Sequence, residues 1–231
     1  MRSRRNGQYG AVRVERSFAF LDLCGFTSFT SIEGDDRATR VLAGFRSAVR
    51  EIASRRGVRV AKWLGDGAMV VAVEPEPLVS AVLEVEQRVD DGRSALPLRA
   101  GMAHGQVILF EGDDYIGSPV NLAARLCDVS GPREVLAVSG LGAHCPPWVV
   151  AGEPYDVVVP GFGGTVEIVR ISRRPPGDCS VVDPVCGLVL PRDAVGARLT
   201  GPSGVIESFC SEACLASWSD SHPSALAVAE P

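Results

Sequence analysis

Residues 58–73, VRVAKWLGDGAMVVAV, constrain the fold of this chain more than any other stretch. Two runs rich in apolar and β-branched residues flank Gly65-Asp66-Gly67, and a short Asp-Gly connection between such runs is typical of a β-hairpin. The pattern therefore predicts two antiparallel strands with the Asp66 carboxylate at their turn. Lys62 is the single lysine of the chain. Taken by itself, this fact is most simply explained if Lys62 is an ordinary solvated strand residue.

Length, charge and hydropathy limit the class of protein. A chain of 231 residues is long enough for one domain of about 150 to 200 residues and a small appendage. The net charge of -5 argues against general affinity for nucleic acid or anionic membranes. No stretch approaches the roughly 18 to 20 apolar residues of a membrane span, and no signal-peptide pattern follows the basic N-terminus. We therefore expect a cytoplasmic protein whose seven cysteines are thiols or metal ligands rather than disulfides.

The first strongly apolar segment carries a carboxylate that is out of place. Residues 17–23, SFAFLDL, form a strand pattern with apolar residues on both faces. A buried carboxylate needs a partner or a metal, so Asp22 near the end of this strand is a candidate ligand. The chain then turns at Cys24-Gly25-Phe26-Thr27 into a helix start, where hydroxyl and backbone N–H groups suit an anion.

The remaining patterns predict a mixed α+β domain. Helical periodicity covers residues 35–56, 78–89 and 120–129, and strand patterns cover residues 97–110, 134–139, 155–159 and 165–171. Within 97–110 we expect two strands with a bend at His104-Gly105, and residues 113–117 are predicted to be a polar loop. The order strand, helix, hairpin, helix, strand predicts a ferredoxin-like αβ sandwich with extra strands.

Composition divides the chain into one large and one small unit. Residues 1–16 are a polar lead-in that we expect to be flexible, and the large domain occupies residues 17–172. Prolines and charge mark residues 173–178 as a linker. Residues 179–223 hold four cysteines but too few apolar residues for an ample core, and residues 224–231 form a low-complexity tail.

The two predicted strands with carboxylates suggest a metal site. If Asp22 ends one strand and Asp66 sits in a neighbouring antiparallel hairpin, both carboxylates lie at one edge of the sheet. Such donors favour Mg²⁺ or Mn²⁺, and a pair of these ions can activate an attacking oxygen and neutralise a leaving phosphate. The anion-friendly turn beside Asp22 then suits a nucleoside triphosphate. Two unrelated surface aspartates remain the alternative on spacing alone.

Three stretches together resemble the signatures of the class III nucleotidyl cyclases. They are Phe20-Leu-Asp22-Leu-Cys-Gly-Phe-Thr27, Lys62-Trp-Leu-Gly-Asp66-Gly67 and Gly117-Ser-Pro-Val-Asn121-Leu-Ala-Ala-Arg125. The resemblance covers about residues 17–171, including the order and spacing of the motifs. It implies the cyclase homology fold, which agrees with the αβ sandwich predicted from the element order.

The resemblance implies a role for each matching residue. Asp22 and Asp66 match the metal-binding aspartates, with the Leu23 carbonyl as a further candidate ligand and Gly25, Phe26 and Thr27 as substrate-binding positions. Lys62 and Asp114 match the pair that selects the purine. That pair suits adenine, because lysine can donate to N1 and a carboxylate can accept from the exocyclic amine. Asn121 matches the residue that positions the ribose, and Arg125 matches the one that stabilises charge on the α-phosphate.

The implied reaction converts ATP to 3′,5′-cyclic AMP and pyrophosphate with two Mg²⁺ or Mn²⁺ ions per site. In this family the metal ligands come from one subunit and the other residues from its partner, which implies a head-to-tail homodimer. One departure is Pro160, which stands where many members have a basic residue that contacts the triphosphate. The alternatives are a catalytically inactive regulator that binds a nucleotide and senses metal, and a guanylate cyclase.

The C-terminal cysteines resemble small YHS and TRASH-like modules, which implies a treble-clef-like unit. The matching residues are Asp183-Pro-Val-Cys186-Gly-Leu and Ser208-Phe-Cys210-Ser-Glu-Ala-Cys214. Three thiolates suit Zn²⁺, Cu⁺ or another thiophilic ion, with Cys179, Asp183 or His222 as a candidate fourth ligand. The alternative is a metal-free unit packed around its aromatic residues. Such a module could report metal or thiol state to the large domain, whereas Cys24, Cys127 and Cys145 are expected to be packing residues.

Overall fold

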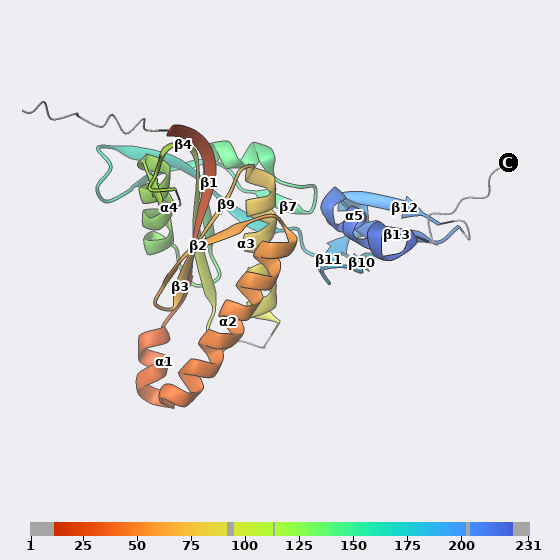
Figure 1. Cartoon of the computed structure of the whole chain (residues 1–231), viewed down its shortest axis with the longest axis horizontal. Coiled ribbons are helices and arrows are strands. Elements are labelled where there is room, and N and C mark those ends of the chain that lie inside the picture. Colours follow the sequence, from red (N-terminus) through yellow and green to blue (C-terminus); the bar gives the residue numbers. More distant parts are fainter. Residues whose placement is uncertain (1–11, 92–94, 113, 202–203, 224–231) are drawn as a thin grey trace, which may run out of the picture.

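The computed structural model describes residues 12–91, 95–112, 114–201 and 204–223. Its main feature is a nine-stranded sheet in the order β2-β3-β1-β4-β6-β9-β7, with β5 paired to β4 and β8 paired to β9 (Figure 1). The strands are β1 (Val12–Leu23), β2 (Arg59–Leu64), β3 (Gly67–Ala72), β4 (Leu98–Phe110), β5 (Asp114–Ile116), β6 (Val135–Val138), β7 (Val149–Ala151), β8 (Tyr155–Val158) and β9 (Thr165–Arg173).

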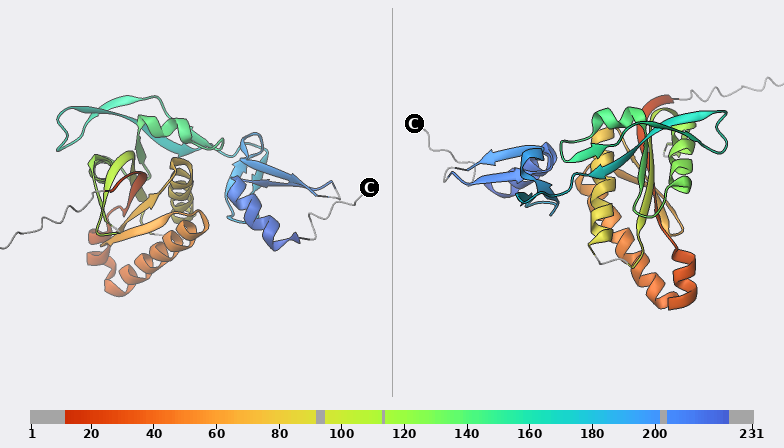
Figure 2. Two further views of the ribbon diagram at one scale, coloured as in Figure 1. Left: turned by 45° about the horizontal axis from the view of Figure 1, so that its top comes forward. Right: turned by 180° about the vertical axis from the view of Figure 1, so that it is seen from behind.

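Helices cover both faces of this sheet. The helices are α1 (Phe26–Glu33), α2 (Asp35–Arg55), α3 (Pro75–Asp90) and α4 (Ser118–Val129). Figures 1 and 2 show α2 and α3 on one side of the strands and α4 on the other. The alternation of β1 explains both layers, since Leu21 and Leu23 belong to the core under α2 and α3, whereas Phe18 belongs to the core under α4. Asp22 alternates with Leu21 and therefore lies on the α4 side.

The mixed α+β architecture and the hairpin are confirmed. β2 and β3 pair antiparallel, with Trp63 opposite Ala68 and Leu64 opposite Gly67, so only Gly65 and Asp66 form the connection. A register irregularity between Val60 and Lys62 bends β2 just before this turn. The hairpin then pairs through β3 with β1 in the centre of the sheet.

Three boundaries differ from the sequence prediction. β1 begins at Val12 rather than Ser17, because residues 12–16 continue the antiparallel ladder with β4 although Arg13, Glu15 and Arg16 are charged. Residues 98–110 form one continuous strand rather than two, and Gly105 keeps the ladder with Arg16 intact. The expected polar loop contains β5, which pairs with the far end of β4. At each of these three boundaries, backbone pairing with a neighbouring strand outweighs the local sequence signal. The predicted tail at 224–231 lies outside the described residues.

Helix α4 approaches the sheet very closely at one glycine. A Cβ atom placed on Gly101 of β4 would lie 2.2 Å from the Cys127 nitrogen and 2.3 Å from the Ala123 oxygen, both backbone atoms of α4. Backbone atoms of a packed helix cannot yield as a flexible side chain would. Gly101 therefore fixes the position of α4 over the sheet.

The C-terminal unit contains two small hairpins and one helix. Its elements are β10 (Ser180–Val182), β11 (Val189–Pro191), the 3₁₀ turn η2 (Arg192–Ala194), β12 (Ala197–Thr200), β13 (Ile206–Phe209) and α5 (Glu212–Ser221). It lies beside α3 and beside a second 3₁₀ turn, η1 (Ser139–His144), which precedes β7 (Figures 1 and 2). A treble-clef description of this unit stays a prediction. None of the helices in the described part of the chain is long and apolar enough to span a membrane.

Gly101→Ala should destabilise the large unit by about 2 to 3 kcal/mol, because the added methyl group forces α4 away from β4. The measurement is the midpoint and slope of urea unfolding. Gly44→Ala is the matched control: Gly44 lies inside α2 with nothing within 4 Å of its added Cβ, so this change should stabilise by about 0.5 to 1 kcal/mol. Equal unfolding free energies for the two variants would contradict this packing account.

Candidate active site

Two carboxylates lie at one edge of the sheet. Asp22 pairs with Gly67 across the β1–β3 ladder, so the Asp66 turn sits beside the end of β1. Partial burial raises the pKa of Asp66, and the nearby Asp22 carboxylate raises it further. The arrangement expected for these two aspartates is therefore present, with Leu23 as the next residue of the same strand end.

The glycine after Asp66 is required by the close approach of β1. A Cβ atom on Gly67 would lie 2.6 Å from the Leu21 carbonyl oxygen and 3.4 Å from Asp22 Oδ1. Any side chain at this position would push the two strands apart and separate the carboxylates. The second glycine of the Gly-Asp-Gly turn thus holds Asp22 and Asp66 together.

Helix α2 fixes the outer side of the same turn. The guanidinium of Arg46 donates a hydrogen bond of 2.8 Å to the Gly65 carbonyl oxygen and stacks 5.1 Å from the centroid of the Trp63 ring. Arg50 lies over the same ring at 4.9 Å. These contacts limit the movement of the turn that carries Asp66.

Arg99 is a site residue that the sequence analysis missed. Its Nε and second terminal nitrogen lie 2.8 and 2.7 Å from Asp22 Oδ2, and its other terminal nitrogen donates to the Asp128 carbonyl oxygen at 3.3 Å. Arg99 stands directly opposite Asp22 in the β1–β4 ladder. Only the register of two strands far apart in sequence could have revealed this neighbour.

Lys62 and Asp114 form a pair of their own. The Lys62 ammonium donates to both carboxylate oxygens of Asp114 at 2.9 Å. The hydrogen bond from Lys62 lowers the pKa of Asp114. Both side chains are well exposed, at 47% and 41%, so they are accessible to a ligand that offers one acceptor and one donor.

The polar residues of α4 point away from its own sheet. Ala123, Leu126 and Cys127 are buried under the helix, whereas Asn121 and Arg125 are exposed. Arg125 forms an exposed ion pair with Asp128 at 3.0 Å. Among the described residues, no hydrogen bond or ion pair joins Asn121 or Arg125 to the carboxylate edge.

The predicted anion turn begins a helix as expected. Gly25 adopts a left-handed conformation with φ of 80° and precedes α1, which starts at Phe26. Thr27 is exposed in this first turn. The hydroxyl groups further along α1 donate to helix carbonyls instead, with Thr30 bonded to the Phe26 oxygen and Ser31 to the Thr27 oxygen. Backbone N–H groups, rather than these hydroxyls, are therefore the donors available to an anion.

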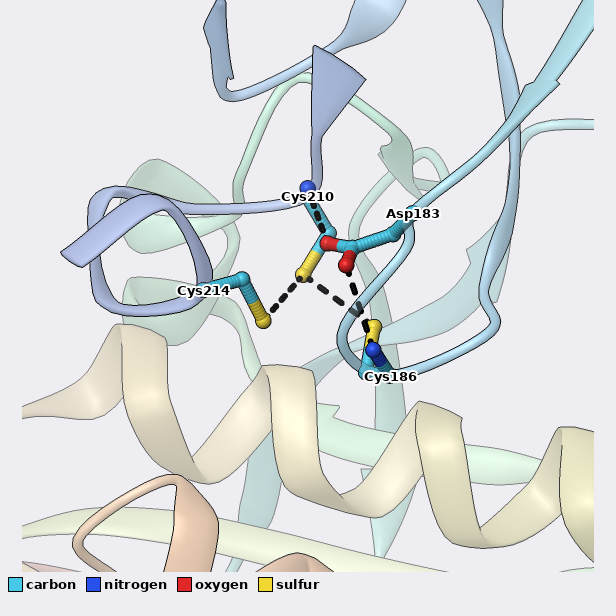
Figure 3. A group of neighbouring side chains, drawn as sticks. All are labelled: Asp183, Cys186, Cys210 and Cys214. Carbon is cyan, nitrogen blue, oxygen red and sulfur yellow. Dashed lines mark hydrogen bonds between the residues drawn. The ribbon is translucent and has the colours of Figure 1, made fainter. Parts of the chain in front are cut away.

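A second cluster lies in the C-terminal unit. Asp183, Cys186, Cys210 and Cys214 bring one oxygen and three sulfur atoms within 4.8 Å of one another (Figure 3). The other two candidate fourth ligands take no part in this group. Cys179 is exposed, and the His222 ring stacks on Trp218 with centroids 4.3 Å apart.

The sulfur atoms are close enough to form S–H···S hydrogen bonds. Cys210 Sγ lies 3.6 Å from Cys186 Sγ and 3.5 Å from Cys214 Sγ. Hydrogen bonds from Cys186 and Cys210 lower the pKa of Cys214 to about 4, and the same contacts raise that of Cys186. Within the hydrogen-bonded pair of Cys186 and Cys214, these contacts favour the thiolate of Cys214. By contrast, burial raises the pKa of Cys127 to about 12 and that of Cys145 to about 11, as suits packing residues.

The sequence of this chain is similar to those of several known proteins. No protein-family model matches the chain. An uncharacterized protein of Mycobacterium tuberculosis is 36% identical over 163 residues, which are 70% of this chain and 42% of that protein. A pH-sensitive adenylate cyclase of the same species is 32% identical over 123 residues, or 53% of this chain and 30% of that protein. The chain thus spans less than half the length of these relatives.

Solved structures share the fold. The adenylyl cyclase CyaB from P. aeruginosa superposes with a TM-score of 0.59 at 25% identity, covering 72% of this chain and 99% of that one. A guanylate cyclase domain from Catenaria anguillulae superposes with a TM-score of 0.61 at 21% identity, covering 71% and 100%. The large unit therefore has the fold of a class III cyclase catalytic domain, and the fold alone does not distinguish the two purine specificities.

Two ion pairs with different burial should respond differently to mutation. Lys62→Ala should change the free energy of unfolding by less than about 1 kcal/mol, because the Lys62–Asp114 pair is exposed to solvent. Glu84→Gln should cost about 3 kcal/mol, because it leaves the buried Arg56 guanidinium without the carboxylate 2.7 Å away. Urea unfolding of both variants measures the difference. A larger loss of unfolding free energy in Lys62→Ala than in Glu84→Gln would show that Lys62 serves the stability of the fold. That result would contradict its assignment to ligand binding.

Proposed function

We propose that this protein is an adenylate cyclase that converts ATP to 3′,5′-cyclic AMP and pyrophosphate. The observation that carries the proposal is the pairing of Asp22 with Gly67, which brings the two acidic side chains of the sheet edge together beside the start of α1. Similarity to adenylate cyclases over 53% and 72% of the chain supports it.

Asp22 and Asp66 are the residues that would hold two Mg²⁺ or Mn²⁺ ions, with the Leu23 carbonyl as a further ligand. The donor set fits these ions, because it consists of hard oxygen atoms in a partly exposed position. When bound, such ions lower the pKa of the 3′-hydroxyl and neutralise charge on the leaving pyrophosphate. The N-terminal N–H groups of α1, at Phe26 and Thr27 behind Gly25, would bind phosphate oxygens.

Arg99 supplies a cation near the predicted triphosphate site, where the sequence analysis identified no basic residue. Its guanidinium is held against Asp22, where it would lie next to the triphosphate and could exchange the carboxylate for a phosphate oxygen. This position would compensate for the proline at Pro160, which lacks a charge. No step of the reaction then depends on a basic residue in the turn after β8.

Lys62 and Asp114 would select the base. Their mutual ion pair holds a donor and an acceptor 2.9 Å apart before any ligand binds. Adenine presents an acceptor at N1 beside an amino donor, which matches this pair, whereas guanine presents the opposite pattern. Guanylate cyclase activity is therefore the less favoured alternative.

The outward direction of Asn121 and Arg125 favours a shared active site. These residues face solvent rather than the carboxylates of their own chain, so a second copy would have to supply them. Large apolar side chains exposed near the hairpin and the β4–β5 arm, namely Leu64, Phe110 and Ile116, offer surface for such a contact. We therefore propose a head-to-tail homodimer in which each site combines Asp22 and Asp66 of one chain with Lys62, Asp114, Asn121 and Arg125 of the other.

The C-terminal unit would act as a metal- or thiol-sensing module of the YHS type, with Zn²⁺ or another thiophilic ion on its cysteines. The cluster of Cys186, Cys210 and Cys214 in Figure 3, called the thiol group below, supports this part of the proposal. The alternative function, an inactive regulator that binds nucleotide and senses metal, would need no second metal carboxylate and no arginine at Arg125.

Incubation with ATP or GTP and Mn²⁺, followed by identification of the cyclic product, tests the proposal. Cyclic AMP should form from ATP at a much higher rate than cyclic GMP from GTP. Asp22→Ala and Arg125→Ala should each lower turnover by about 100-fold or more, because each removes charge stabilisation from the reacting phosphate. Arg170→Ala, which removes another exposed arginine, should leave turnover within about twofold.

Unchanged turnover in Asp22→Ala or Arg125→Ala would refute the assignment of these residues. A product of GTP alone would replace the proposed specificity with that of a guanylate cyclase. Circular dichroism and urea unfolding of each variant show whether a loss of turnover reflects chemistry rather than unfolding.

A further inference from the structure

A buried arginine of the large unit contacts the cysteines of the small unit. Arg56 caps the C-terminus of α2 and is only 7% exposed. Its guanidinium donates to Glu84 at 2.7 Å and to the sulfur of Cys210 at 3.2 Å, and lies 3.8 Å from the sulfur of Cys186. The thiol group is therefore in direct contact with both units of the chain.

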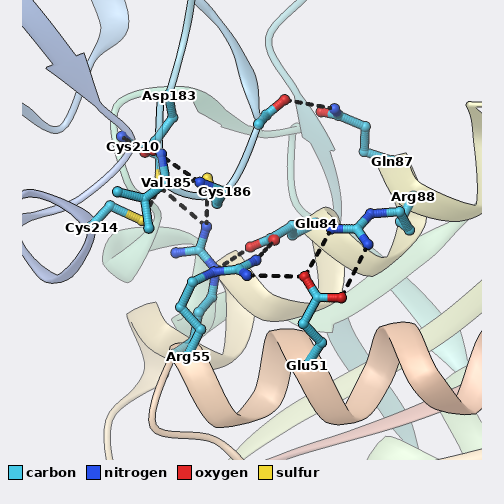
Figure 4. Close-up of polar contacts among 12 residues, drawn as sticks. Glu51, Arg55, Glu84, Gln87, Arg88, Asp183, Val185, Cys186, Cys210 and Cys214 are labelled. Atoms are coloured by element: carbon cyan, nitrogen blue, oxygen red, sulfur yellow. Dashed lines mark hydrogen bonds and ion pairs between the residues drawn. The ribbon is translucent and has the colours of Figure 1, made fainter. Parts of the chain in front are cut away.

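Positive charge exceeds negative charge on the large-unit side of this contact. Three guanidinium groups share two carboxylates. Arg55 and Arg56 both pair with Glu84. Arg55 and Arg88 both pair with Glu51 (Figure 4). A buried guanidinium without a full counter-charge is costly. Toward the small unit, Arg56 contacts the sulfur atoms of Cys186 and Cys210, which are negatively charged when they bind a metal ion as thiolates.

Asp183 serves as the scaffold of the thiol group. Its two carboxylate oxygens accept hydrogen bonds from the backbone N–H groups of Val185, Cys186 and Cys210 at 2.8, 3.1 and 2.7 Å. These bonds fix the loop that carries Cys186 against the strand that carries Cys210. With the carboxylate occupied in this way, three sulfur atoms are the donors that remain.

The spacing of the sulfur atoms fits one metal ion. Three thiolates on a single Zn²⁺ at about 2.3 Å lie roughly 3.8 Å from one another. The two sulfur separations from Cys210 are 3.6 and 3.5 Å. An ion could therefore enter with a shift of only a few tenths of an ångström in each side chain.

A pocket lies beside this group at the seam between the units. Its volume is about 500 Å³, and it is lined by Arg56, Cys210 and Ser211 together with Glu76 and His144 of the large unit. The indole Nε1 of Trp148 also donates to the Cys210 carbonyl oxygen at 2.9 Å. The pocket and this second bond place Cys210 at the junction of the two units.

We propose that Arg56 of the large unit supplies the counter-charge to the thiophilic cation, Zn²⁺ or Cu⁺, that Cys186, Cys210 and Cys214 would bind, so that the ion site is shared by both units. Three thiolates give the Zn²⁺ complex one excess negative charge and the Cu⁺ complex two. The guanidinium of Arg56 compensates part of this charge where water is excluded. The inference rests on the metal-binding part of the proposed function, but it is independent of cyclase activity because it concerns ion affinity alone.

The test is a competition titration of the full chain, under anaerobic reducing conditions, with chelators of known affinity for Zn²⁺ and, separately, for Cu⁺. Arg56→Gln should weaken the binding of the preferred ion by about 10- to 100-fold, the range typical of residues that contact metal ligands. Arg55→Gln is the matched control. It removes a guanidinium from the same carboxylate but touches no sulfur, so its affinity should stay within about threefold of the wild type.

A second variant covers the case in which Arg56→Gln does not fold. The double substitution Arg56→Met with Glu84→Leu replaces the buried pair with apolar residues of similar size, a change that proteins usually tolerate. It should weaken ion binding by the same 10- to 100-fold. Alkylation followed by mass spectrometry should show that the bound ion protects Cys186, Cys210 and Cys214 but leaves Cys179 reactive.

Two results would overturn the proposal. One is wild-type affinity in Arg56→Gln or in the double variant, which would show that the site belongs to the small unit alone. The other is a wild-type chain that binds neither ion, which would leave the cysteines as packing residues. Neither result bears on the cyclic nucleotide assay. The second would also remove the metal-binding part of the proposed function, whereas the first would leave it in place, so the two failures can be told apart.

Discussion

The antiparallel register of β1 and β3 is the constraint on which the candidate active site depends. With Asp22 opposite Gly67, the last polar residue of the first strand meets the tight turn of the hairpin. A shift of one residue would turn Asp22 to the other face of the sheet and bury it under α2 and α3. The missing side chain at Gly67 makes the register possible, since a Cβ there would collide with the Leu21 carbonyl oxygen.

Much of this arrangement could be predicted from sequence, because its signals are local. The Gly-Asp-Gly turn between β-branched runs predicted the hairpin, and periodicity predicted α2, α3 and α4 to within a few residues. The pairing of Asp22 with the hairpin followed from treating the two segments as neighbours. Sequence pattern failed where pairing overrides composition, as in residues 12–16 of β1 and in β5.

The residues that sequence analysis missed act across long separations. Arg99 reaches Asp22 only because β4 lies next to β1, and Arg56 reaches Cys210 only because the small unit lies beside the end of α2. Neither arginine carries a local signal in a chain rich in arginine. The positions of the three candidate fourth ligands likewise required the fold, which placed Asp183 beside the thiols as an acceptor of backbone hydrogen bonds and left Cys179 and His222 outside. The contacts of Arg99 and Arg56 show that the partner of a charged side chain is decided by the tertiary structure.

The central claim is that two copies of the chain build each active site, and a defined heterodimer tests it most directly. One subunit carries Asp22→Ala and the other Arg125→Ala, each with its own affinity tag, so that only mixed dimers are purified. One of the two sites then has intact residues from both chains, whereas the other has lost both. The account predicts about half the wild-type rate of cyclic AMP formation, although each variant homodimer is inactive. A mixed dimer as inactive as its parents would contradict it.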